Sequence, residues 1–210
     1  MNAARAGAKI AAACLGLALW TATPATATPK NLQGKTVSFT FTTAERGGTC
    51  EHRSTIRFSK DQIFYSQEHI RCGRTGGTDL PRGYGTVIPV NRSGAIRNVC
   101  TVEFGDLAER CTDGFIRKRD GSLRGRETWS GTRSSKVTEG QIVVSQRTNM
   151  VGSWSRKDGQ SGSYDMTYDI TLTIAVAGKN CRVSGYRFRA SGSMPYAGDF
   201  RSSRKCTISG

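Results

Sequence analysis

A strict alternation of apolar and polar residues near the C-terminus constrains the fold of this chain more than any other feature. From Tyr164 to Val176, apolar side chains occupy the even positions, and aspartates and threonines occupy the odd positions from Asp165 to Thr173. A period of two residues places the two kinds of side chain on opposite faces of an extended strand, whereas a helix would scatter them around its axis. The segment therefore predicts a long, half-buried β-strand.

The remainder of the chain after residue 27 shows the same pattern of strands and turns. Val37, Phe39 and Phe41 alternate with Thr and Ser, and no stretch shows sustained helical periodicity. Further strands are predicted at 55–58, 62–66, 86–90, 99–104, 114–119, 123–129, 141–146, 150–155, 182–190 and 205–208. Asp120-Gly121 and Asp158-Gly159 lie between such runs and are typical of tight hairpins. The pattern predicts an all-β fold class, an antiparallel sandwich or small barrel in a single domain.

The first 27 residues have the pattern of a secretory signal peptide. Arg5 and Lys9 precede an apolar run that ends at Trp20, and Ala25-Thr26-Ala27 offers a small-residue cleavage site. The run is much shorter than the roughly 20 residues that cross a bilayer core, so an N-terminal membrane anchor is the less favoured alternative. We expect residues 1–27 to be cleaved and 28–210 to form one β-rich mature domain without a transmembrane span. The expected location is the periplasm or the exterior of a Gram-negative bacterium.

An even number of cysteines follows the leader. They are Cys50, Cys72, Cys100, Cys111, Cys181 and Cys206. An even count in an exported chain indicates disulfide bonds, because oxidising compartments form and keep them. Sequence alone does not choose among the possible connectivities. We predict pairing between neighbours, 50–72, 100–111 and 181–206, so that each bond links a local hairpin or loop.

Two histidines accompany the first cysteine pair. Together Cys50, His52, His69 and Cys72 supply two sulfurs and two imidazoles, the ligand set of a tetrahedral zinc site. Cys50 and His52 would project from the same face of a strand, so their convergence is geometrically possible. Exported thiols are normally oxidised, however, which favours a disulfide flanked by two ordinary histidines over zinc. We therefore predict no metal and no cofactor.

The sequence lacks the motifs of the common enzyme classes. It contains no Gly-x-Ser-x-Gly elbow, His-Glu-x-x-His pair, P-loop or dinucleotide fingerprint. Asp165 and Asp169 would share one face of the long strand, but i, i+4 residues in a strand lie about 13 Å apart at the backbone. That separation is too large for a tight acid/base pair. The sequence therefore favours a non-catalytic protein, and we name no catalytic residue.

The strongest indication of function is the excess of positive charge. Lys and Arg number 31 against 16 Asp and Glu, a formal net charge of +15 at pH 7. Most of these cations are arginines, which form bidentate contacts with phosphate, sulfate or carboxylate that lysine cannot match. Two dense segments supply the candidate anion-binding residues. They are Arg117, Lys118, Arg119, Arg124 and Arg126 in the first segment and Arg187, Arg189, Arg201 and Arg204 in the second.

A surface of this kind would attract an anionic polymer or the surface of a cell envelope. No recognised nucleic-acid-binding module is present, so nucleic acid is the least favoured polyanion. We expect a non-catalytic exported protein that binds an anionic envelope or extracellular partner through an Arg-rich face. Three alternatives stay open: a secreted inhibitor or host-interaction protein with a disulfide-pinned loop, a hydrolase or lyase acting on acidic glycans, and a basic protein without a particular partner. The sequence does not give the oligomeric state.

Two short stretches carry a resemblance to a known group of proteins. Leu32-Gln33-Gly34-Lys35-Thr36-Val37 opens the expected mature chain, and Asn180-Cys181-Arg182-Val183 with Cys206-Thr207-Ile208 closes it. In these stretches the chain resembles uncharacterised secreted proteins of rhizobial-type alphaproteobacteria, which begin with a Gly-Lys strand and end in a pair of strands linked by cysteines. The resemblance implies export, β structure and a 181–206 disulfide. It implies no catalytic or binding residue.

Overall fold

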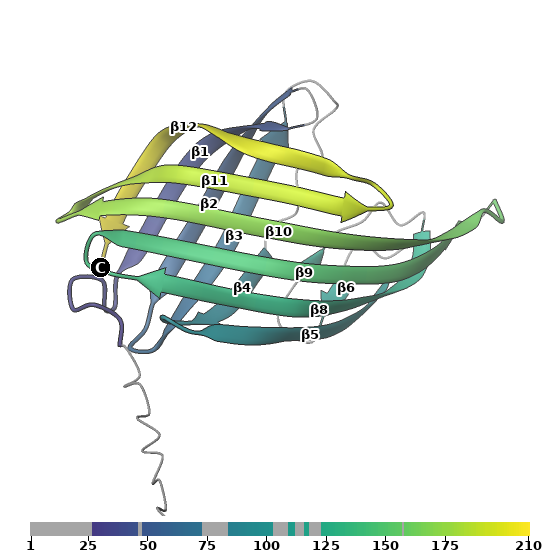
Figure 1. Cartoon of the computed structure of the whole chain (residues 1–210), viewed down its shortest axis with the longest axis horizontal. Helices are drawn as coiled ribbons and strands as arrows, with labels where there is room; N and C mark the ends of the chain where they lie inside the picture. Colours follow the sequence, from purple (N-terminus) through teal and green to yellow (C-terminus); the bar gives the residue numbers. More distant parts are fainter. Residues whose placement is uncertain are drawn as a thin grey trace, which may run out of the picture.

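Alternating side chains and hairpin turns fold the chain into one antiparallel sheet that curls into a nearly closed barrel (Figure 1). The structure is a computed structural model that describes residues 27–45, 48–72, 84–102, 109–111, 116–117, 123–156 and 158–210. Its strands are β1 (Thr36–Glu45), β2 (Gly48–Phe58), β3 (Gln62–Cys72), β4 (Tyr84–Pro89), β5 (Ser93–Val102), β6 (Glu109–Cys111), β7 (Ile116–Arg117), β8 (Leu123–Val137), β9 (Gln141–Arg156), β10 (Ser161–Ala177), β11 (Asn180–Gly192) and β12 (Tyr196–Ser209). In the sheet they follow the order β4-β3-β2-β1-β12-β11-β10-β9-β8-β5-β6-β7.

The predicted all-β class is confirmed, and of the two predicted architectures the barrel is the one observed. The long strand predicted from Tyr164 to Val176 lies within β10, and Met166, Leu172 and Ile174 on its apolar face are buried. The predicted Asp158-Gly159 hairpin joins β9 to β10, with Gly159 at a φ of +85°. The Asp120-Gly121 turn lies outside the described residues.

Most strands are longer than predicted, and one predicted division into two strands is wrong. The segments 141–146 and 150–155, predicted as two strands, form the single strand β9. The polar residues between them, Arg147, Thr148 and Asn149, stay paired with both β8 and β10. Thr148 is buried and accepts a hydrogen bond from Gln146 Nε2 at 2.8 Å. A polar side chain can therefore continue an inward-facing row when a neighbour on the same strand satisfies its hydroxyl.

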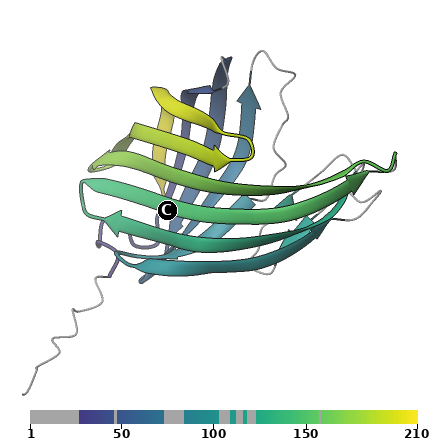
Figure 2. The ribbon, with the colours of Figure 1, turned by 45° about the vertical axis from the view of Figure 1, so that its right-hand side comes forward.

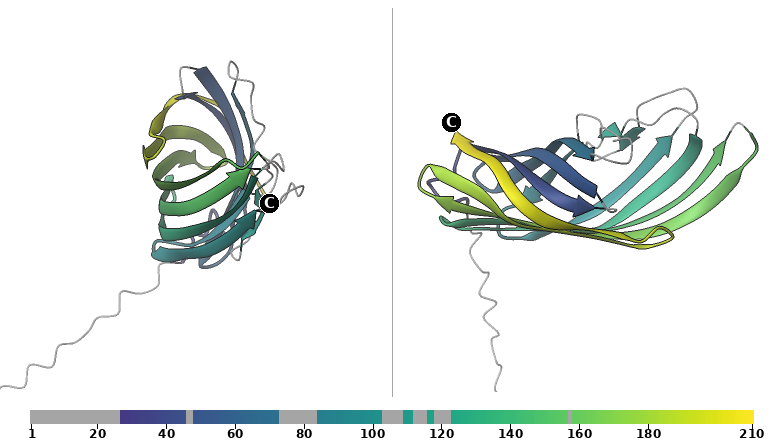
Figure 3. Two further views of the ribbon diagram at one scale, coloured as in Figure 1. Left: turned by 90° about the vertical axis from the view of Figure 1, so that its right-hand side faces the viewer. Right: turned by 90° about the horizontal axis from the view of Figure 1, so that it is seen from above.

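The interior divides into two regions along the long strands. The closed half is the region around a core of aliphatic residues and phenylalanines, including Val37, Phe39, Phe41, Ile56 and Ile174. The open half is the region around a second core at the far ends of β8, β9 and β10, where these strands extend past β1–β3 as a curved wall (Figure 2, Figure 3). The second core consists of Trp129, Met150, Met166, Phe188 and Ala190, with Tyr164, Tyr168, Ile170, Tyr186 and Tyr196 packed against it.

Side-chain hydrogen bonds close the barrel where β4 meets β8. Asn91, in the turn after β4, has a φ of 52°, a left-handed conformation that Asn tolerates better than most residues. Its Oδ1 accepts a hydrogen bond from Val137 N–H at 2.6 Å, and its Nδ2 donates to Val137 O at 3.2 Å. Nearby, Ser135 Oγ donates to Pro89 O at 2.9 Å. These bonds join the two strands at a position where their backbones form no ladder.

Within the ranges described above, no helix is long and apolar enough to cross a membrane.

Candidate anion-binding face

The two arginine-rich segments predicted from the sequence lie far apart in the fold. Arg126 of β8 lies opposite Ser153 of β9, whereas Arg187 of β11 lies opposite Thr171 of β10. Ser153 pairs in turn with Ser163 of β10, so the two arginines are offset by eight positions along β10, or about 26 Å. Two strands, β9 and β10, also lie between β8 and β11 in the sheet. The two segments therefore do not form one surface. For Arg117 and Arg124 the structure places only the backbone, and Lys118 and Arg119 lie outside the described residues.

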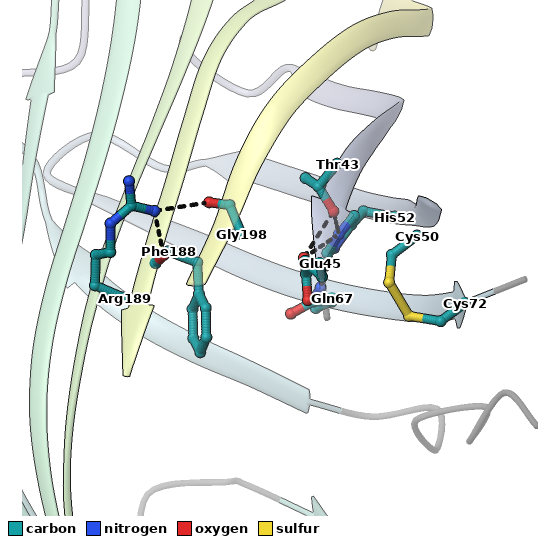
Figure 4. Close-up of polar contacts among 9 residues, drawn as sticks. All are labelled: Thr43, Glu45, Cys50, His52, Gln67, Cys72, Phe188, Arg189 and Gly198. Carbon is teal, nitrogen blue, oxygen red and sulfur yellow. Dashed lines mark hydrogen bonds and ion pairs between the residues drawn. A yellow bond between two sulfur atoms is a disulfide. The ribbon is translucent and has the colours of Figure 1, made fainter. Parts of the chain in front are cut away.

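Arg189 is occupied by contacts within its own hairpin. Its Nη2 lies 2.9 Å from Asp199 Oδ1. Its Nη1 donates to Phe188 O at 2.9 Å and to Gly198 O at 3.5 Å (Figure 4). On the neighbouring strands, Arg147 Nε lies 3.6 Å from Asp169 Oδ1. As the sequence predicts, Arg187 and Arg189 alternate with the inward-facing Tyr186 and Phe188. Local carboxylates nevertheless neutralise part of the outer surface of β9–β12.

Two further predicted arginines occupy β-bulges of β12. Lys205 pairs with Thr40 and Ser203 with Phe41, so Arg204 between them has no partner on β1. The register shifts again between Ser202 and Phe200, so Arg201 also has no partner on β1. Both arginines are exposed. A bulge re-aims the side chain of the extra residue, and bulges are over-represented beside functional sites.

A row of hydroxyl side chains separates these arginines from a second set of cations. Thr36, Ser38 and Thr40 point outward from β1, between β12 and β2. Lys205 and Arg53 lie opposite Thr40 from its two sides, and they are therefore about 10 Å apart at the backbone. The surface formed by Arg53, Arg57, Arg201, Arg204 and Lys205 around this row is called the basic face below.

The cations of the basic face have no carboxylate partner in the described part of the structure. Among the described residues, none of the five takes part in an ion pair. The acidic residues of β1, β2 and β12 are Glu45, Glu51 and Asp199. Glu45 contacts His52 and Asp199 contacts Arg189, which leaves Glu51 as the acidic neighbour on the same surface. The basic face therefore retains most of its positive charge.

Sequence reasoning missed the two arginines of β2. Arg57 lies across from Phe64 of β3, with its Cζ 5.3 Å from the ring centroid, a cation–π contact that restricts the guanidinium. A period-two signal was present. Cys50, His52, Ser54, Ile56 and Phe58 are buried, and the residues between them point outward. Arg53 and Arg57 escaped notice because they are not part of a dense run of charge.

A polar cluster inside the barrel lies around His52 (Figure 4). His52 is 1% exposed and stacks on Phe41 with ring centroids 4.6 Å apart. Its Nδ1 lies 3.2 Å from Gln67 Nε2, and its Nε2 lies 2.8 Å from Thr43 Oγ1 and 3.1 Å from Glu45 Oε1. Because an amide nitrogen can only donate, Nδ1 is the acceptor and Nε2 carries the proton. The cluster joins β1, β2 and β3.

The geometry of this cluster does not match a catalytic triad. A triad places the nucleophile and the carboxylate on opposite nitrogens of the imidazole. Here Thr43 and Glu45 both lie at Nε2, and Thr43 Oγ1 itself donates to Glu45 Oε1 at 2.7 Å. The hydroxyl is fully buried as well. The arrangement satisfies buried polar groups and offers no activated nucleophile.

Two of the three predicted disulfides are confirmed. Cys50–Cys72 and Cys181–Cys206 are bonded, with Cα–Cα distances of 4.0 Å and 5.4 Å. The Cys50–Cys72 bond uses both sulfurs of the alternative four-ligand zinc site, so that set of ligands cannot bind zinc. The His69 side chain lies outside the described part of the structure. Cys100 lies opposite Cys111 in the β5–β6 register, but their side chains are not described, so that bond stays a prediction. Disulfides are consistent with an oxidising, exported environment.

A buried carboxylate, Glu127, lies in the open half. It is 1% exposed, and its Oε2 accepts a hydrogen bond from Trp129 Nε1 at 3.1 Å. The Tyr164 hydroxyl donates to its Oε1. The Tyr164 ring packs over Gly152 and the Trp154 ring over Gly162, so that each ring covers a glycine on the neighbouring strand. No sequence pattern singled out Glu127, because it stands alone between Arg126 and Thr128.

The chain was compared with protein-family models, curated proteins and solved structures, and none of them matches it.

Proposed function

We propose that this protein binds a linear anionic polymer on the basic face, along the hydroxyl row of β1. The observation on which the proposal depends is the pair of β-bulges that leave Arg201 and Arg204 exposed, with no acidic partner among the residues that the structure describes. Each bulge interrupts the β1–β12 ladder, and each time the extra residue is an arginine. Bulges also add twist to a curved sheet, but a surface that contacts an anion gains two exposed guanidinium groups from these two.

The arrangement around β1 suits an extended ligand better than a compact one. Cations border the hydroxyl row on both sides, with Lys205 and Arg204 on β12 and Arg53 on β2. The row from Thr36 to Thr40 is about 13 Å long at the strand rise. A chain lying along it would meet alternating positive charge and hydroxyl donors. The net charge of +15 would add long-range attraction that raises the rate of encounter.

Binding of this kind is driven largely by the release of counterions, so its affinity falls as salt is added. We expect fluorescein-labelled polyphosphate or heparin to bind in a fluorescence-anisotropy titration, with log K falling linearly against log salt concentration. Replacing Arg201 and Arg204 with Gln should reduce the slope by about two, one for each lost contact. The affinity at low salt should fall roughly tenfold or more.

A matched control separates the basic face from net charge. Arg92→Gln with Arg97→Gln removes the same two charges from exposed positions just before and within β5, where neither arginine has a described ion pair. If the basic face is the site, this control should keep most of the affinity and a slope close to that of the unmodified protein. An equal loss in both double variants would show that only net charge matters. Binding that resists salt would contradict the proposal and favour a protein partner.

A further inference from the structure

The pairing between β11 and β12 ends well before the two strands do. Ladder pairs join Arg187–Ala190 to Tyr196–Asp199, next to the hairpin turn. Toward the other end, the strands are linked by the Cys181–Cys206 disulfide, with a Cα–Cα distance of 5.4 Å. One side-chain bond crosses the interval, from Val183 N–H to Ser203 Oγ at 3.2 Å. A covalent bond therefore holds the strands together where ladder hydrogen bonds do not.

The disulfide brings three cations together on the outer surface. Cys181 and Cys206 are partly buried against the core. Each is followed, toward the hairpin turn, by an exposed cation that points outward: Arg182 on β11 and Lys205 on β12. Arg204, at its bulge, lies beside Lys205. None of the three takes part in an ion pair among the described residues. Like charges on neighbouring strands repel, so this cluster lowers the stability of the unliganded protein.

The other described disulfide has the opposite surroundings. Cys50 and Cys72 are themselves a register pair at the end of the β2–β3 ladder, which joins these strands by backbone pairing from Phe58 to Cys50, with one register shift between Arg53 and Ser54. The next pair in that ladder is Glu51 with Arg71, two residues of opposite charge. Cys50–Cys72 thus lies where the strands are paired and the adjacent charges are opposite. Cys181–Cys206 links strands that are unpaired at this position and carry adjacent positive charges.

We infer that the Cys181–Cys206 disulfide assembles a discrete oxyanion site from Arg182, Arg204 and Lys205, which binds one phosphate or sulfate group. The inference rests on the proposed function: this site is where the basic face continues onto β11 and holds one charged group of the polymer. Two guanidinium forks and one ammonium approach from two strands, a donor set that suits the several oxygens of a tetrahedral anion. A planar carboxylate has two oxygens and would use fewer of these donors.

The disulfide is a positioning element of this site. Without it, the Val183–Ser203 bond would be the described hydrogen bond that joins β11 directly to β12 in this interval, while β11 stays paired with β10 and β12 with β1. The ends of β11 and β12 would separate, and Arg182 would no longer lie beside Lys205. Affinity for a phosphate or sulfate polymer is then expected to depend on the oxidation state of Cys181 and Cys206.

The test compares two disulfide variants of the mature chain in the anisotropy titration. One has Cys181→Ser with Cys206→Ser, and its matched control has Cys50→Ser with Cys72→Ser. The probes are labelled polyphosphate, heparin and polygalacturonate, which carry phosphate, sulfate and carboxylate groups, and inorganic phosphate serves as a competitor. Circular dichroism verifies that each variant is folded. Arg182→Gln, which keeps the disulfide, tests the site if the first variant does not fold.

We expect the 181/206 variant and Arg182→Gln each to lose at least about fivefold in affinity for polyphosphate or heparin. Both should lose less for polygalacturonate, and the 50/72 variant should stay within about twofold of the unmodified protein. Displacement by inorganic phosphate at millimolar concentration would show that the single group is recognised apart from the polymer. Equal losses in the two disulfide variants, or an unchanged affinity in Arg182→Gln, would overturn the inference while leaving the proposed function intact. If the unmodified protein binds none of the polymers, the proposed function itself fails.

Discussion

The closed and open halves of the barrel are filled by different kinds of side chain. The closed half is filled by aliphatic residues and phenylalanines, and its polar groups are gathered around His52. The open half is filled by tyrosines, tryptophan and methionines, and Glu127 is buried among them. Aliphatic residues pack densely, whereas Tyr and Trp require partners for their hydroxyl and N–H groups. The difference indicates that the closed half provides most of the stability and supports the basic face on its outer surface.

The largest expected effect is the loss of a large side chain from the closed half. Phe41 is fully buried, and its ring contacts His52 and Tyr186 at centroid distances of 4.6 Å and 5.0 Å. Phe41→Ala should lower the free energy of unfolding by about 3–5 kcal/mol, measured by urea denaturation. Met166→Ala in the open half should lower it by about 2 kcal/mol, because flexible neighbours can close part of the cavity. A larger loss for Met166→Ala would reverse the assignment of stability to the two halves.

A smaller effect is expected at the buried carboxylate of the open half. Glu127→Ala leaves the Trp129 N–H and the Tyr164 hydroxyl without the acceptor that each uses now. Each unsatisfied donor costs about 1–3 kcal/mol, and relaxation or entry of water reduces the total. We expect a loss of about 2 kcal/mol in the free energy of unfolding, together with a red shift of tryptophan fluorescence. Glu127→Gln keeps one oxygen acceptor and should lose about half as much. No change in either variant would show that the carboxylate is solvated.

Because Tyr65 is buried in the closed half, we predict an effect of pH on stability that is confined to alkaline solution. Burial raises the pKa of Tyr65 above its ordinary value of 10.0. Ionisation of the phenol is therefore harder in the folded protein than in the unfolded chain. Tyr65 contributes its full stabilising effect below about pH 10, and this contribution is lost as the pH rises through the raised pKa.

Thermal unfolding between pH 8 and 12 measures this effect directly. The melting temperature should fall more steeply above pH 10 in the unmodified protein than in Tyr65→Phe, which has no phenol to ionise at this position. Parallel curves for the two proteins would mean that water reaches Tyr65 in the closed half.

Much of the fold follows from alternation that is visible in the sequence. Tyr164–Val176 predicts most of β10, and the two disulfides that the structure confirms are among those predicted by pairing neighbouring cysteines. Apolar alternation does not reveal that residues 141–156 form one strand, because the inward-facing row is continued at Gln146 and Thr148 by polar side chains that bond to each other. The choice between barrel and sandwich depends on long-range closure through Asn91 and Val137, which no local pattern encodes.

The candidate site was predictable only in part. Arg201 and Arg204 stand out as a charge-rich segment, but the sequence does not show that both occupy bulges. Arg53 and Arg57 become part of the same surface because β1 lies between β2 and β12, a pairing of the two ends of the chain. Charge density along the sequence also groups Arg126 with the site, although the fold places it on a distant part of the sheet. Proximity across strands, rather than along the chain, defines the basic face.

The most direct test of the central claim maps the bound polymer onto the sheet. Backbone amide chemical shifts of residues 28–210 would be followed by NMR during a titration with a short polyphosphate at moderate salt. We predict that the shifts that change will cluster on β12, β1 and β2, with Arg201, Arg204 and Arg53 among the most affected. Changes centred on β5 and β8, or spread evenly over all exposed cations, would contradict the claim that the basic face is a binding site.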